Sequence, residues 1–205
     1  MIRIIDYGVG NIQAFVTMFK SLGIPAERAS TSSELTDATK LILPGVGAFD
    51  HAMQQLNKSG MRDTMDAMVL EQQVPVLGVC VGMQMLASSS DEGVLPGLNW
   101  ISGRVRAFDN MTEAEEQLPL PHMGWNDLQV NPDAKLFSGF EPQPRFYFLH
   151  SYYFDCDDKA DVAATATYGF EFPCVVSKSH IHGVQCHPEK SHHFGAQLLK
   201  NFAEL

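Results

Sequence analysis

The sequence predicts an α/β fold with a central, largely parallel sheet, helices on both faces and a more antiparallel second half. Three observations support this prediction. Short apolar runs alternate with amphipathic segments over roughly the first ninety residues. These runs are almost continuously apolar, as in strands that are buried on both faces of a parallel sheet. Beyond Ser90, strand-like stretches follow one another and are separated by turns rich in Pro, Gly, Asp and Asn.

The first half of the chain supplies the parallel strands and their helices. Apolar residues recur at helical spacing from Ile12 to Leu22, Asn11 is a suitable N-cap, and Gly23 ends this helix. The expected strands cover residues 2–5, 41–43 and 74–79, and further helical segments cover residues 49 to about 73 and 82–89.

The second half is predicted to be mainly β-structure. Its expected strands cover residues 103–108, 125–130, 145–154, 162–167, 173–177 and 181–187. A final helix over residues 191–205 carries Phe194, Leu198 and Phe202 on one apolar stripe. The acidic stretch at residues 112–117 is expected to be a solvated loop.

Length and composition favour one globular domain spanning residues 1–205. A chain of this size buries roughly 70–75% of its unfolded surface, so it needs no disulfides to fold. The formal net charge is -10, and no basic patch is present, which argues against nucleic acid as a partner. We find neither a signal-peptide pattern nor an apolar run of membrane-spanning length, and therefore expect a cytoplasmic protein with four reduced cysteines.

A cysteine framed by two glycines is the first candidate for chemistry. Gly78-Val79-Cys80-Val81-Gly82 has the form of a nucleophile elbow, in which a strained turn joins a strand to a helix. The N-terminal N–H groups and the dipole of that helix are expected to stabilise a thiolate. The alternative is a buried structural cysteine, which is a common environment for this residue.

A histidine near the C-terminus is the candidate base. His187 precedes Pro188, which cannot join a central ladder, so the strand is expected to stop at His187 and place it at the sheet edge. Glu189 is positioned to bind the second imidazole nitrogen and to fix the tautomer. The alternative is an ordinary surface turn.

Two cofactor signals are present and both are weak. A metal site is suggested by His180, His182, Cys186, His187, His192 and His193, but strand alternation places the first three on the face opposite to His187. Gly8-Val9-Gly10 opens like a dinucleotide fingerprint, yet Gln13 stands where that fingerprint has glycine. We therefore predict neither a metal nor a cofactor. Separately, the glycine-rich turn Pro44-Gly45-Val46-Gly47 follows a strand and can aim a backbone N–H at a developing oxyanion.

Taken together, these motifs resemble those of the class I (triad-type) glutamine amidotransferases, and the resemblance covers nearly the whole chain. The elbow and the His-Pro-Glu sequence are typical of the superfamily. Other blocks resemble the glutaminase subunits of imidazole glycerol phosphate synthases, although the elbow there is commonly Gly-Ile-Cys-Leu-Gly. These blocks are Asp6-Tyr7-Gly8-Val9-Gly10-Asn11, Pro121-His122-Met123-Gly124-Trp125-Asn126, Phe148-Leu149-His150-Ser151-Tyr152 and His187-Pro188-Glu189-Lys190-Ser191.

The resemblance implies a flavodoxin-like fold and a glutaminase that passes ammonia to a (β/α)₈-barrel synthase subunit in histidine synthesis. It implies a Cys80–His187–Glu189 triad, L-glutamine as the substrate, and no metal or organic cofactor. Further residues implied are Gly45, Val46, Gly47 and Val81 at the oxyanion, Gln84, Ser151 and Tyr152 in the glutamine pocket, and Asn11, Trp125, Tyr147 and Lys190 at the partner interface.

Three alternatives remain open from the sequence. One is a paralogous amidotransferase subunit of another pathway. Another is a stand-alone cysteine hydrolase of the same fold, which would be active without a partner. The last is a non-catalytic binding module in which Cys80 is structural.

Overall fold

The computed structural model describes residues 1–108, 119–141 and 143–205. An eight-stranded sheet forms its centre, and the first five strands in sheet order are parallel while the remaining three are antiparallel. The predicted fold class is therefore confirmed, because the sheet begins in the flavodoxin-like order and continues as antiparallel strands. In sheet order the strands are β2 (Ala26–Ala29), β1 (Ile2–Ile5), β3 (Lys40–Gly45), β4 (Val76–Cys80), β13 (Ile181–Val184), β12 (Phe170–Lys178), β11 (Val162–Tyr168) and β8 (Gln129–Val130).

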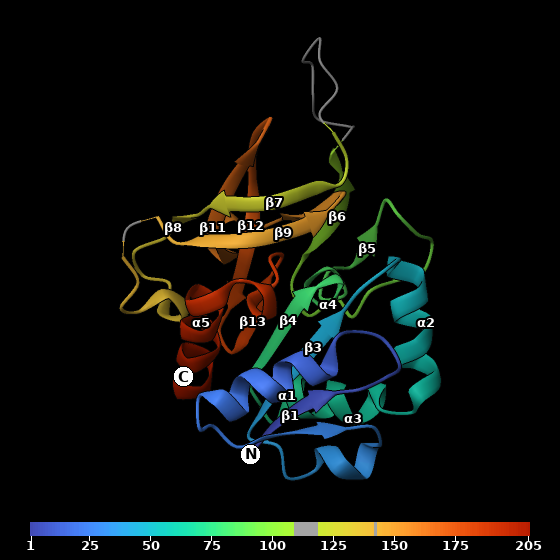
Figure 1. Ribbon diagram of the computed structural model, residues 1–205. Coiled ribbons are helices and arrows are strands. Elements are labelled where there is room, and N and C mark those ends of the chain that lie inside the picture. The colour runs from blue at the N-terminus through green and yellow to red at the C-terminus, as the bar shows by residue number, and fades with distance from the viewer. Residues whose placement is uncertain (109–118, 142) are drawn as a thin grey trace.

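Helices cover both faces of the parallel part of the sheet (Figure 1). On one face, α1 (Ile12–Ser21) lies beside α5 (His192–Glu204), and α2 (Phe49–Ser59) and α3 (Arg62–Asp66) lie on the other. A π-helical turn, η2 (Ala67–Glu71), continues α3 toward β4. Across residues 1–108, 119–141 and 143–205, the helices are all too short or too polar to cross a membrane.

Two smaller sheets are built from the second half of the chain. One has the order β10 (Tyr152–Cys156), β6 (Gly103–Ala107) and β5 (Ser89–Ser90), and the other pairs β7 (His122–Asp127) with β9 (Arg145–His150). The run at 145–154 is thus two strands rather than one, because it changes sheets at Ser151. The buried ring of Phe172 contacts the rings of Phe108 and Phe148, which are also buried.

Three further sequence predictions need correction, and another falls outside the described residues. Helix α4 (Val81–Gln84) is four residues long, instead of spanning 82–89, because the carbonyls of residues 85–88 accept hydrogen bonds from the N–H groups of residues 97–100. Strand β13 ends at Val184, three residues before His187. Asn11 is at the N-cap position, but its side chain makes no capping hydrogen bond. The expected loop at 112–117 lies outside the described residues.

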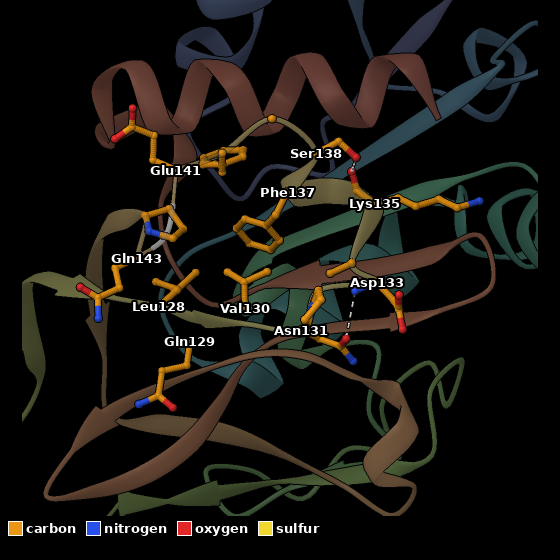
Figure 2. A pocket seen from close by; sticks show the side chains of 15 residues that line it. Leu128, Gln129, Val130, Asn131, Asp133, Lys135, Phe137, Ser138, Glu141 and Gln143 are labelled. Atoms are coloured by element: carbon orange, nitrogen blue, oxygen red, sulfur yellow. Dashed lines mark hydrogen bonds between the residues drawn. The ribbon is translucent and has the colours of Figure 1, made fainter.

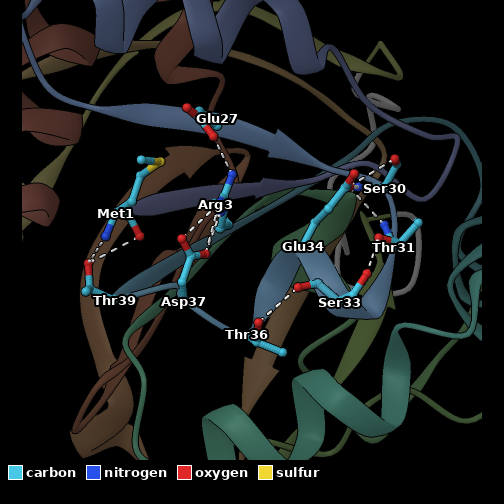
Figure 3. Close-up of polar contacts among 10 residues, drawn as sticks. All are labelled: Met1, Arg3, Glu27, Ser30, Thr31, Ser33, Glu34, Thr36, Asp37 and Thr39. Atoms are coloured by element: carbon cyan, nitrogen blue, oxygen red, sulfur yellow. Dashed lines mark hydrogen bonds and ion pairs between the residues drawn. The ribbon is translucent and has the colours of Figure 1, made fainter.

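The amino ends of the parallel strands are held by ion pairs (Figure 3). Arg3 on β1 donates two hydrogen bonds of 3.0 Å to Asp37 and one of 2.6 Å to Glu27 on β2. The terminal amine of Met1 donates to Thr39, just before β3. At this end of the sheet, the polar side chains therefore link neighbouring strands.

Candidate functional site

Cys80 occupies a strained turn at the carboxyl end of β4. Its backbone has φ +55° and ψ −115°, a region that residues other than glycine rarely adopt and that is typical of a nucleophile elbow. The side chain is 4% exposed. Because α4 has only four residues, the long helix dipole that we expected at Cys80 is absent, and the nearby polar groups must supply the stabilisation instead.

Three glycines allow the elbow to pack closely on the neighbouring strand. Gly45, at the end of β3, pairs in register with Cys80. A Cβ atom on Gly82 would collide with the carbonyl of Leu43, and one on Gly45 would collide with the backbone N of Gly82. A Cβ on Gly78 would lie 2.5 Å from the carbonyl oxygen of Gly82. The glycine frame seen in the sequence is therefore a steric requirement of this close approach.

Replacing Gly82 with alanine is expected to lower both the stability of the protein and the reactivity of Cys80. Overpacking of this kind costs about 1–3 kcal/mol, which denaturant unfolding would measure. Gly60→Ala is the control for reactivity. Its positive φ of +72° also makes alanine strained and lowers stability, but a Cβ there meets no neighbour and leaves the elbow untouched, so Cys80 alkylation should not slow. An unchanged rate of Cys80 alkylation in folded Gly82→Ala would contradict this account of the glycine frame.

His187 and Glu189 form a buried pair beside Cys80. Nδ1 of His187 lies 2.8 Å from Oε1 of Glu189, and both side chains are 5% exposed or less. Among the described residues, Oε2 of Glu189 has no hydrogen-bond partner. Burial alone lowers the pKa of His187, but hydrogen bonds to Cys80 and Glu189 outweigh it and raise that pKa to about 9. The imidazole is therefore protonated near neutral pH.

The backbone of His187 is fixed although it lies outside the strand. Its N–H donates to the carbonyl of Tyr147 on β9 at 2.9 Å, and its own carbonyl accepts a hydrogen bond of 2.7 Å from the Ser191 hydroxyl. The same hydroxyl accepts from the N–H of Tyr147 at 3.0 Å. Ser191 is completely buried, and sequence reasoning missed this anchoring role.

A cavity of about 290 Å³ opens over Cys80. It brings together predicted residues from four separate segments of the chain, and Gly45 is in register with Cys80 on the neighbouring strand. Its lining residues are Val46, Gly47, Cys80, Val81, Gln84, Glu92, Pro121, Leu149, His150, Ser151, Tyr152, His187 and Lys190.

Four of the lining residues were not predicted as site residues: Glu92, Pro121, Leu149 and His150. Glu92 is the important one, because it brings a carboxylate into the cavity. Its Oε2 accepts a hydrogen bond of 2.8 Å from the N–H of Phe49 at the start of α2. A single Glu in a polar run carries no sequence pattern that marks a site. Glu92 could be identified only from the folded structure, in which the turn after β5 packs against the start of α2.

Three of the four predicted interface residues lie at or beside the rim of the cavity. The ammonium of Lys190 lies 5.8 Å from the ring centre of Tyr147, which is 6.3 Å from the ring of Trp125. Trp125 is 40% exposed, and its neighbour Met123 is 63% exposed. Asn11 is exposed separately at the start of α1.

A larger cavity, of about 670 Å³, lies between β8 and the segment that leads to β9 (Figure 2). Its side chains include Asp133, Lys135 and Glu141, but no cysteine or histidine, so it does not compete as a nucleophilic site. The residues of the metal alternative are engaged separately: His182 contacts Ser177, and His180 contacts the carbonyl of Val69.

Comparisons with known proteins identify the family of this chain. The family model described as glutamine amidotransferase class-I matches residues 3–205. The chain is 58% identical to imidazole glycerol phosphate synthase subunit HisH of Bdellovibrio bacteriovorus, and the match covers 100% of both chains. It is 50% identical to the protein of the same name from Leptospira interrogans, again over 100% of both.

Solved structures share the fold at low sequence identity. A crystal structure of a glutamine amidotransferase superposes with a TM-score of 0.74 at 20% identity, covering 99% of this chain and 97% of that one. The structure of PurLQS from Thermotoga maritima gives 0.74 at 17% identity, with the same coverage. The family model matches almost the whole chain, and the relatives named above align with it over their full length. The chain therefore belongs to the class I glutamine amidotransferases.

Proposed function

We propose that this protein is the glutaminase subunit of imidazole glycerol phosphate synthase and works through a Cys80–His187–Glu189 triad. The observation that carries the chemistry is the strained Cys80, which lines one cavity together with His187, whose imidazole is paired with Glu189. The specific assignment rests on full-length relatives that bear this subunit's name. We also expect one domain spanning residues 1–205 and a cytoplasmic location.

Glutamine would bind with its side-chain amide over Cys80. Glu92 offers a carboxylate for the α-ammonium group, and Gln84, Ser151 and Tyr152 offer polar contacts along the cavity. The glutamine carbonyl oxygen would point to the N–H of Val81 and to one N–H of the Gly45-Val46-Gly47 turn. Donors placed in this way stabilise negative charge as it develops in the transition state.

Hydrolysis would proceed in two half-reactions. His187 takes the proton of the Cys80 thiol, and the thiolate attacks the amide carbon to form a C–S bond. The resulting tetrahedral oxyanion collapses as the C–N bond breaks. His187 gives its proton to the departing ammonia, leaving a γ-glutamyl thioester. His187 then takes a proton from water, the hydroxide adds to the thioester, and glutamate and the Cys80 thiolate are released. The reaction needs neither a metal nor an organic cofactor.

The ammonia would pass to a (β/α)₈-barrel synthase subunit in a heterodimer. Trp125, Tyr147 and Lys190 form a contiguous group at or near the cavity, and exposed Met123 adds apolar area to it. An exposed aromatic and apolar surface beside a charged residue suits a protein interface. Asn11 would extend that interface from the start of α1.

Activity is expected to depend on the partner. Glycines on both sides of Val46 make a backbone rotation inexpensive, and Gly47 already has φ +80°. One orientation would place a second donor at the oxyanion and the other would remove it. The loss of one such donor lowers kcat by about 10²–10³-fold. The isolated chain is therefore expected to hydrolyse glutamine slowly, and a liganded barrel subunit should accelerate it by that factor.

The test is a glutaminase assay of the chain alone, and then with its barrel subunit and a substrate analogue. Lys190→Ala should reduce the partner-dependent rate while Cys80 alkylation by a glutamine analogue persists. Lys135 is an exposed lysine that lines the larger, 670 Å³ cavity, so Lys135→Ala is the matched control. It should change neither the partner-dependent rate nor the alkylation of Cys80. Full activity without a partner would instead favour the stand-alone hydrolase.

A further inference from the structure

Gln185 is a completely buried amide that the mechanism above does not use. It lies between the end of β13 and His187, and its backbone N–H donates to the carbonyl of Cys174 at 2.8 Å. Its side-chain Nε2 lies 3.7 Å from Sγ of Cys80, within hydrogen-bonding distance for sulfur. Its Oε1 lies 3.0 Å from Nε2 of Gln84. A buried amide is costly unless its groups are hydrogen-bonded, so both contacts matter.

The carbonyl of Tyr152 fixes the orientation of this amide. That carbonyl can only accept hydrogen bonds, and it faces Nδ1 of His150 at 2.7 Å and Nε2 of Gln84 at 3.4 Å. Gln84 must therefore present its NH₂ group on this side, and the same group reaches Gln185. Oε1 of Gln185 must therefore accept the hydrogen bond from Gln84, and the NH₂ group of Gln185 then points at Cys80. The series of hydrogen bonds from Tyr152 through Gln84 and Gln185 thus ends in an N–H donor directed at the sulfur of Cys80.

We propose that Gln185 is a catalytic residue that donates a hydrogen bond to the Cys80 thiolate. The proposal rests on the nucleophilic role of Cys80 argued above. A hydrogen bond to a charged acceptor is roughly twice as strong as one between neutral groups, so the donor favours the thiolate over the thiol. It acts twice in each cycle, once when the thiolate forms and again when the thiolate departs from the thioester. No covalent bond to Gln185 forms or breaks.

Other groups also act on Cys80, and the test must separate them from Gln185. His187, the Tyr7 hydroxyl and the Cys186 thiol all lie close enough to interact electrostatically with it. Glu92, His150 and Lys190 line the same cavity. Each of these remains in place when only Gln185 is replaced.

The experiment is the rate of Cys80 alkylation by iodoacetamide across a range of pH in the full chain. Gln185→Met keeps an unbranched side chain and removes the donor. Its profile should move about one unit to higher pH, as expected for one hydrogen bond to a charged group, so its alkylation should be about tenfold slower on the rising limb of the profile. At high pH the two rates should converge.

Two further variants keep the test decisive. Gln185→Glu retains the oxygen toward Gln84 but replaces the NH₂ group with oxygen, so it should shift the profile in the same direction even where Gln185→Met folds poorly. Asn201→Leu removes another buried amide, one that donates to the carbonyls of Leu136 and Ser138, and should leave the profile unchanged.

The possible failures are distinguishable. An unshifted profile in a folded Gln185 variant, or a slowing that is equal at every pH, would overturn the role of Gln185 and leave Cys80 as the nucleophile. If Cys80 of the unmodified protein is not alkylated at any pH, the proposed function itself fails.

Discussion

Replacing Cys80 with alanine is expected to abolish glutamine-dependent synthesis in the complex with the barrel subunit. No other side chain on the cavity floor can form the thioester, so the loss in kcat should approach about 10⁶-fold, the size found when an acyl-transfer enzyme loses its nucleophile. Free ammonia at high pH should still support synthesis, because the variant changes only the ammonia source. Steady-state assays with glutamine and with ammonium salts measure both rates.

The control for this variant is another buried cysteine. Cys156 lies on β10, and burial raises the pKa of its thiol to about 12, so it is neutral and unreactive. Cys156→Ala should keep its glutamine-dependent activity. Retained glutaminase activity in Cys80→Ala would remove Cys80 from the mechanism altogether.

His187→Ala is expected to lose more activity than Glu189→Gln. His187 moves a proton in both half-reactions, and such acid–base groups contribute about 10²–10⁴-fold. Glu189 only orients the imidazole and stabilises its charged form through the 2.8 Å contact. Comparing kcat/KM for the two variants tests this ranking, and equal or reversed losses would show that the roles are misassigned.

The pH dependence offers a second readout of the same pair. Ammonia departs only when His187 carries a proton, so the rate should fall as the pH rises through about 9. The Glu189 hydrogen bond helps to raise the pKa of His187, so Glu189→Gln should move that fall to lower pH. An alkaline limb that does not move would mean that Glu189 does not act on His187.

Sequence patterns predicted the parts of the site that follow buried strands. The apolar runs before Gly45 and Cys80 identify strands directly, and parallel strands bring their carboxyl ends to one edge. The prediction failed where long-range pairing decides the local structure. Ser89 and Ser90 form a strand because β6 lies beside them, and β2 was missed because its centre is Glu27-Arg28, a charged pair on an edge strand.

Buried polar residues were the least predictable part of the site. Ser191 and Gln185 are completely buried, yet a serine and a glutamine have no periodic pattern that marks their function. Their roles depend on partners far away in the sequence: Tyr147 for Ser191, and Gln84 and Cys80 for Gln185. Only the folded structure brings these pairs together.

The most direct measurement is peptide mapping of the intact chain after incubation with an electrophilic glutamine analogue. We expect one adduct per chain, located on Cys80 and suppressed by excess glutamine. Burial raises the pKa of the thiols of Cys156, Cys174 and Cys186, so these three should stay unmodified. An adduct on one of these three, or no adduct at all, would contradict the assignment of Cys80 as the glutamine-specific nucleophile.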